Sequence, residues 1–71
     1  MTVKIGDRVE IEQAWEDDDG FFHAAFAEVI GIADDGELRL RFEEKAVDDF
    51  YGNGAVGAGF TEADVEVVEA R

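Results

Sequence analysis

The side chains with the most evident capacity for chemistry are 19 carboxylates and one histidine, His23. The chain has no Cys and no Ser, so a nucleophile would have to be Thr2 or Thr61. Catalytic zinc sites usually have several nitrogen or sulfur ligands, which this composition does not supply. The carboxylates are predicted to lie on a solvated surface, where burial does not tune their pKa values. We therefore expect a protein with no catalytic residues, no metal site and no cofactor.

Two segments have the spacing of ligand-binding motifs without the surroundings that those motifs need. Asp17, Asp19 and Glu28 occupy positions one, three and twelve of a calcium loop. Phe22 stands at the sixth position, where glycine is required. Residues 52–57 spell G-x-G-x-x-G, but too little chain follows them for the βαβ unit of a dinucleotide site. We interpret residues 16–20 as a polar loop between two strands and residues 52–57 as a flexible loop.

The formal net charge of -13 is the strongest compositional signal. The acids are spread from Asp7 to Glu69, which predicts a folded domain with an acidic surface rather than a charged tail. Such a surface repels itself in dilute buffer, whereas molar salt shortens the Debye length to ~3 Å. With few lysines and no Cys, the composition resembles proteins of extreme halophiles that keep salt inside the cell. The alternative is an acidic protein that binds a basic partner.

The length of 71 residues predicts one domain, spanning residues 1–71, with a thin core. The first residues lack the long apolar stretch of a signal peptide. No run of about 18 apolar residues predicts a membrane span. We therefore expect a cytoplasmic protein with no membrane contact, either a monomer or a subunit of a complex.

Alternation of apolar and polar residues predicts strands in the first 42 residues. Val9, Ile11, Gln13 and Trp15 form one side of the first strand, and residues 21–32 form a long second strand. The doubled Val29-Ile30 predicts a bulge or a strand buried on both faces. Asp35-Gly36 is typical of a hairpin turn, after which residues 38–42 alternate again.

The remaining chain predicts shorter elements. Ala46, Val47 and Phe50 can line one side of a short helical turn. The glycine-rich residues 50–60 are interpreted as a strand fragment with a mobile loop. Thr61 begins a capped helical turn, and residues 65–67 form the last strand. The expected fold is all-β, a small five-stranded antiparallel barrel with a short helical turn before the last strand.

The order of these elements resembles the SH3-like barrels of the Tudor and KOW kind. The resemblance extends over nearly the whole chain. It rests on Gly6-Asp7-Arg8-Val9, on Trp15 followed by Asp19-Gly20 and Phe22-His23-Ala24-Ala25, and on Tyr51-Gly52-Asn53. The chain departs from the family pattern in a longer connection before Tyr51 and in a segment at residues 54–60 that looks like an insertion.

The resemblance to Tudor-like modules implies an aromatic cage for a methylated ammonium, held by cation–π attraction. Carried over to this chain, the cage positions are Trp15, Phe22 or His23, Phe42 and Tyr51, with Asn53 nearby as a hydrogen-bonding group. The alternative is that Phe22 and Phe42 are core residues and that Trp15 packs over one end of the barrel.

Two functions follow as expectations. The first is a non-enzymatic binding module for a protein or peptide partner. The alternative is a KOW-like barrel associated with RNA or the ribosome, whose phosphate-facing groups would be Lys4, Arg8, Arg39, Arg41 and Lys45. Basic side chains gathered on one face would favour nucleic acid, whereas scattered basic side chains paired with acids would favour a protein partner.

Overall fold

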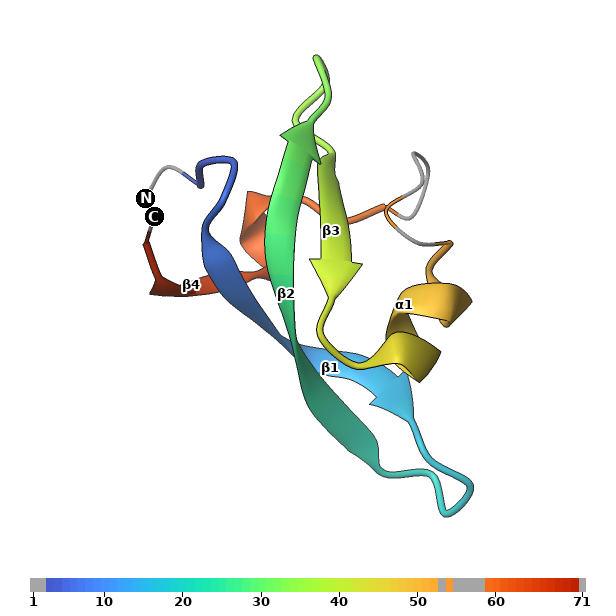
Figure 1. Cartoon of the computed structure of the whole chain (residues 1–71). Helices are drawn as coiled ribbons and strands as arrows, with labels where there is room; N and C mark the ends of the chain where they lie inside the picture. Colours follow the sequence, from blue (N-terminus) through green and yellow to red (C-terminus); the bar gives the residue numbers. More distant parts are fainter. Residues whose placement is uncertain (1–2, 53, 55–58, 71) are drawn as a thin grey trace.

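A single antiparallel sheet forms the centre of the computed structural model, which describes residues 3–52, 54 and 59–70 (Figure 1). Its four strands lie in the order β3-β2-β1-β4. The elements are β1 (Arg8–Glu16), β2 (Phe22–Ile32), β3 (Leu38–Phe42), the helix α1 (Lys45–Phe50), the 3-10 turn η1 (Glu62–Asp64) and β4 (Glu66–Glu69). The mostly-β class and the helical turn before the last strand are confirmed.

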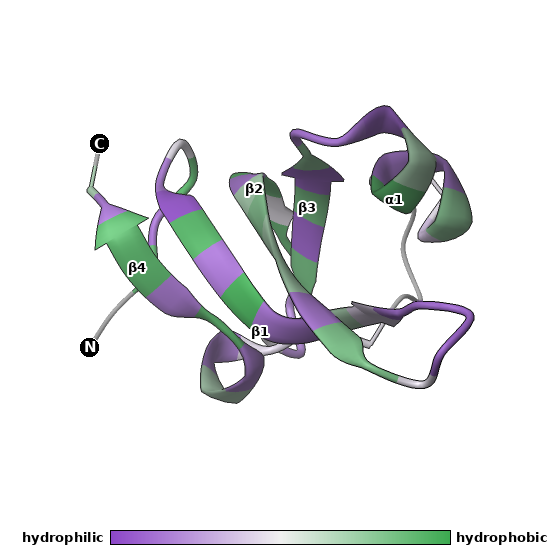
Figure 2. Ribbon diagram, turned by 90° about the horizontal axis from the view of Figure 1, so that it is seen from below, coloured by the Kyte–Doolittle hydropathy of each residue, from purple (hydrophilic) through white to green (hydrophobic). Residues whose placement is uncertain are grey.

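β1 and β2 are the two longest strands and form a hairpin. Their pairing has a register shift that the alternation of apolar and polar residues does not predict. Val9 pairs with Ala27 and Ile11 with Ala25, and the register then shifts before Trp15 meets His23. Alternating hydropathy is visible along β1 (Figure 2). Because of the register shift, Ala14 is buried and Gln13 is exposed. The prediction that Gln13 continues the buried side of the strand was therefore wrong.

The second hairpin follows the sequence closely. Gly36 adopts a φ of 91°, which the tight turn between β2 and β3 requires. The register shifts between Val29 and Gly31, so the predicted bulge is confirmed. In β3 three buried side chains alternate with exposed arginines, as the period of two predicts: Leu38, Leu40 and Phe42.

The chain after β3 turns into a helix. Phe42 donates its backbone N–H to Asp48 Oδ1 at 2.9 Å, which ties α1 to the end of β3. Val47 is buried, but Ala46 and Phe50 are exposed, so the predicted apolar side of this turn is only partly formed. The fifth strand expected within residues 50–60 is not found among the described residues of that segment. Residues 53 and 55–58 lie outside the described part of the chain.

The last strand begins after a capped turn. The backbone N–H of Thr61 donates to Asp64 Oδ2 at 2.9 Å, as one half of a capping box around η1. β4 then pairs with the first half of β1, where Val9 lies opposite Val67 and Glu10 opposite Glu66. The predicted cap and the predicted last strand are both confirmed.

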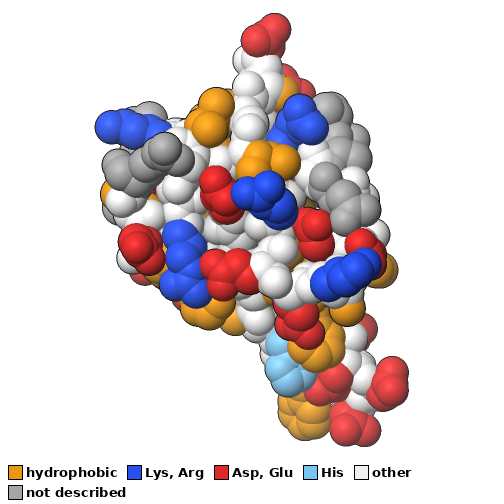
Figure 3. Space-filling model, viewed as in Figure 1, with side chains coloured by type: hydrophobic (Ala, Val, Ile, Leu, Met, Phe, Trp, Pro, Cys, Tyr) orange, Lys and Arg blue, Asp and Glu red, His pale blue; other side chains and the backbone are white. Residues whose placement is uncertain are grey.

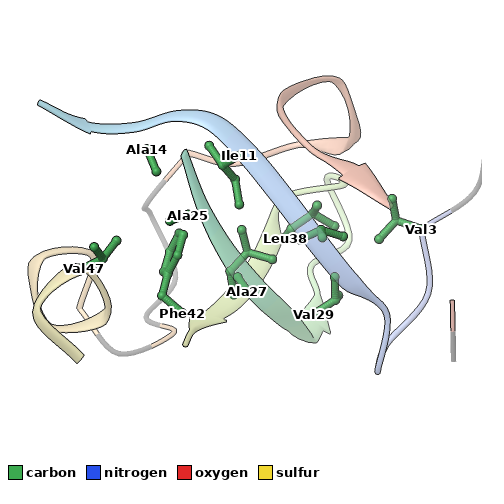
Figure 4. Close-up of a cluster of buried hydrophobic side chains, with 11 residues drawn as sticks. Val3, Ile11, Ala14, Ala25, Ala27, Val29, Leu38, Phe42 and Val47 are labelled. Atoms are coloured by element: carbon green, nitrogen blue, oxygen red, sulfur yellow. The ribbon is translucent and has the colours of Figure 1, made fainter. Parts of the chain in front are cut away.

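The core lies against one face of the sheet and is small (Figure 4). Its buried apolar side chains are Val3, Val9, Ile11, Ala14, Ala25, Ala27, Val29, Leu38, Leu40, Phe42 and Val47. Asp7 is buried too, and its Oδ2 accepts the backbone N–H of Lys4 at 2.9 Å, which closes the turn before β1. No helix in the described part of the chain is long and apolar enough to cross a membrane.

Candidate functional site

A hollow of about 540 Å³ lies between the end of the β1–β2 hairpin and α1, and we call it the aromatic groove. Figures 1 and 2 both show α1 beside the end of β1. The groove is lined by Gln13, Ala14, Trp15, Glu16, Phe22, Glu44, Ala46, Val47, Phe50 and Tyr51. Four of these ten residues are aromatic, and they come from two places in the sequence: the β1–β2 hairpin supplies Trp15 and Phe22, and the end of α1 supplies Phe50 and Tyr51.

Trp15 is held in place by its cross-strand partner. The rings of Trp15 and His23 stack with their centroids 4.3 Å apart. His23 Nε2 lies 2.7 Å from Asp17 Oδ2, and because a carboxylate only accepts, Nε2 carries the proton. Asp17 Oδ1 also accepts the backbone N–H groups of Asp19 and Phe21 at 2.9 and 3.0 Å. The acidic loop therefore holds the imidazole against the indole.

Tyr51 is fixed from the other side of the groove. Its hydroxyl donates to the carbonyl oxygen of Ala14, at the register shift of β1. Its ring stacks on that of Phe42 with the centroids 5.1 Å apart, and it meets the ring of Phe60 edge to face with the centroids 4.9 Å apart. The ring of Phe50 also meets the Tyr51 ring edge to face, with the centroids 5.0 Å apart. Two opposite sides of the groove are thus oriented before any ligand arrives.

The structure distributes the cage residues implied by the Tudor resemblance over three places. Trp15, Phe22 and Tyr51 line the groove together. His23 supports Trp15 from behind, and Phe42 is only 4% exposed within the core. Asn53 lies outside the described residues. Phe50 at the end of α1 lines the groove as well, although the sequence predicted it only as part of a helical turn and not as a binding residue.

Asp17, in the loop that supports Trp15, has a pKa below its ordinary value. The hydrogen bond from His23 is the main cause that lowers the pKa of Asp17, with a contribution from the backbone N–H of Phe21. A carboxyl group with a lowered folded-state pKa stabilises the fold above its ordinary pKa. This stabilisation is lost as the pH falls through the lowered value.

We expect carboxyl-carbon NMR to show Asp17 titrating below an ordinary aspartate, because its charged form accepts these hydrogen bonds. His23→Ala should move the midpoint upward. Glu43, whose pKa is lowered chiefly by its hydrogen bond to Arg8, is the internal control and should not move. An Asp17 midpoint that is unchanged by His23→Ala would show that the imidazole does not hold this loop.

Basic side chains on the outer face of the sheet are engaged by acids. Arg8 Nε lies 2.6 Å from Glu43 Oε2, and the guanidinium stacks over Phe26 at 4.3 Å. Arg41 Nη2 lies 2.7 Å from Glu28 Oε1. Figure 3 shows Lys and Arg side chains scattered over this face among acidic and hydrophobic ones.

The other candidate phosphate-facing residues differ in their surroundings. Lys45 Nζ lies 2.8 Å from Asp49 Oδ2, one helical turn further along α1. Arg39 Nε donates to the carbonyl oxygen of Gly54 at 2.8 Å. Lys4 is exposed in the turn before β1. Of the five candidate residues, Arg8, Arg41 and Lys45 thus lie within ion-pair distance of an acid.

No protein-family model, curated protein or solved structure matches this chain. Within residues 3–52, 54 and 59–70, no group of three His, Asp or Glu side chains is arranged to hold a metal ion. Function is therefore inferred from the groove and from the charge around it.

Proposed function

We propose that this chain is a non-enzymatic binding module that takes a short apolar and basic segment of a protein partner in the aromatic groove. The observation that carries the proposal is the exposure of the aromatic side chains. Phe50 is 78% exposed and Phe22 is 56% exposed, yet both line one hollow with Trp15 and Tyr51. Apolar side chains gathered around a concave surface are typical of ligand sites.

The charge of the groove favours a cationic ligand. Glu16 and Glu44 are the charged members of the described lining, and none of the described lining residues is basic. A Lys or Arg side chain that enters such a groove gains cation–π attraction from the rings and a carboxylate partner at the rim. Its methylene groups cover apolar surface at the same time.

As part of the same proposal, we assign the domain to the SH3-like folds of the Tudor type. The sequence motifs around Trp15 and Tyr51 support this assignment. So do the strand order β3-β2-β1-β4 and a 3-10 turn directly before the last strand. The RNA-associated alternative has less support, because Arg8, Arg41 and Lys45 already contact acids.

We further propose that the protein works in a salt-rich cytoplasm. The 19 Asp and Glu side chains outnumber the six Lys and Arg side chains and leave a net charge of -13, and the acids are spread along the chain rather than gathered in one segment. Molar salt shortens the Debye length to ~3 Å, so a rim carboxylate attracts a bound cation mainly when the two are in direct contact.

The proposal is tested with three short peptides, one of Arg and Leu, one of Glu and Leu, and one of Gly and Ser. Fluorescence of Trp15, the single tryptophan, follows the titration. We expect saturable binding of the Arg–Leu peptide only. Phe50→Ala should weaken it by about tenfold, because an aromatic anchor of the groove contributes on the order of 1.4 kcal/mol.

Phe21→Ala is the matched control, since Phe21 is 69% exposed in the neighbouring loop but does not line the groove. It should leave the affinity unchanged. The proposal is overturned if the Arg–Leu peptide does not bind at millimolar concentration, or if both Phe variants weaken it equally.

A further inference from the structure

A second hollow of about 610 Å³ lies on the other side of Tyr51, between β1, η1 and β4, and we call it the acidic groove. Gln13 and Tyr51 line both hollows, so the acidic groove adjoins the aromatic groove along β1. Phe60, packed edge to face on Tyr51, extends the aromatic surface into it. The acidic groove is further lined by Glu10, Ile11, Glu12, Gly59, Ala63, Asp64, Val65 and Glu66.

The acids of this groove are placed at a cost to the fold. Glu10 and Glu66 are directly opposite each other in the β1–β4 ladder. Like charges at opposed positions of an antiparallel pair are destabilising, whereas opposite charges there are stabilising. The neighbouring pair, Arg8 opposite Glu69, has the favourable combination. A cation bound between Glu10 and Glu66 would relieve this repulsion, so the pair is an argument for a cationic ligand that is independent of the aromatic groove.

We infer that the ligand is an extended peptide that runs along β1 through both grooves, with an apolar anchor beside Trp15 and basic side chains beside Glu10 and Glu66. This inference rests on the proposed function and specifies the class of peptide that the module binds. From Glu10 to Trp15 a strand rises roughly 17 Å, since each residue adds ~3.3 Å. An extended ligand therefore places its basic residues about five positions from its anchor.

Charge decides among the other occupants of the two grooves. A second copy of this chain would bring a further net charge of -13 to an acid-lined surface. A nucleic acid would bring phosphates to the same carboxylates. Both are repelled where a basic peptide is attracted, and the attraction of a peptide falls as salt rises.

The test compares an Arg–Leu anchor peptide with the same peptide extended by a four-residue Gly–Ser spacer and two lysines. Both are titrated by Trp15 fluorescence at the lowest KCl concentration at which circular dichroism shows the chain folded. We expect the extended peptide to bind about tenfold more tightly. A variant with Glu10→Gln and Glu66→Gln should remove this gain and leave the affinity of the anchor peptide unchanged.

Asp18→Asn with Asp34→Asn is the matched control, because it removes the same charge at exposed positions outside both grooves. This control should retain the tenfold gain. The inference is overturned if both double variants lose the tenfold gain in affinity, or if the parent chain shows no such gain. In either case, binding of the anchor peptide alone still supports the proposed function. If neither peptide binds, the proposed function itself fails. Tighter binding of a single-stranded oligonucleotide than of the extended peptide would also overturn the inference.

Discussion

Replacing Leu38 with alanine should lower the free energy of unfolding by about 3 kcal/mol, the usual cost of a cavity left by a buried leucine. Leu38 is 1% exposed in β3, and its backbone N–H donates to Phe60 O at 2.7 Å. This loss should be a large part of the total free energy of unfolding, because a chain of this size buries little apolar surface. Urea denaturation in 2 M KCl, followed by circular dichroism, measures it.

Val68→Ala is the control for this substitution, since Val68 is 44% exposed in β4. It should change the free energy of unfolding by less than about 0.5 kcal/mol. A loss of less than about 1 kcal/mol in Leu38→Ala would mean that this side chain does not occupy the centre of the core.

Raising KCl from 0.1 M to 2 M should raise the melting temperature by about 10 °C, which corresponds to about 2 kcal/mol for a domain of this size. The physical reason is screening of the net charge of -13, which opposes compaction when it is unscreened. Screening also weakens the exposed pairs Arg8–Glu43, Arg41–Glu28 and Lys45–Asp49, but such pairs contribute little. Differential scanning calorimetry at pH 7 provides the measurement.

The same salt series at pH 4 is the control. Many of the carboxylates are protonated there, so less repulsion remains for salt to screen and the increase in melting temperature should shrink. A melting temperature at pH 7 that does not depend on KCl would contradict the proposal of a salt-rich native environment.

Local patterns in the sequence predicted the parts of the fold that depend on neighbouring residues. The alternation in residues 38–42, the turn at Gly36 and the cap at Thr61 each follow from side-chain period or backbone preference, and each is confirmed. The register shift between Ile11 and Trp15 was not predictable in this way. It places Ala14 inward, where its carbonyl accepts the Tyr51 hydroxyl, and that contact joins residues far apart in the sequence.

In the candidate site, too, local patterns predicted some features and contacts between distant residues determined the others. Trp15 and Tyr51 were recognised through their motifs, but whether an aromatic residue lines a groove or the core depends on tertiary packing. Phe42 alternates correctly within β3 and is therefore buried, while Phe50 ends α1 and is exposed beside the groove. The placement of α1 against β3 includes the hydrogen bond from the N–H of Phe42 to Asp48, an interaction that no local pattern reveals.

The most direct test of the aromatic groove is a ¹H–¹⁵N correlation spectrum recorded during titration with the Arg–Leu peptide. The Trp15 indole Nε1 is a specific reporter, because it is buried and has no hydrogen-bond partner among the described residues. We predict that the largest shifts occur at this indole and at the backbone amides of Ala46, Val47 and Tyr51. Shifts confined to the outer face around Arg8 and Arg41, or no shifts at millimolar peptide, would contradict binding in the groove.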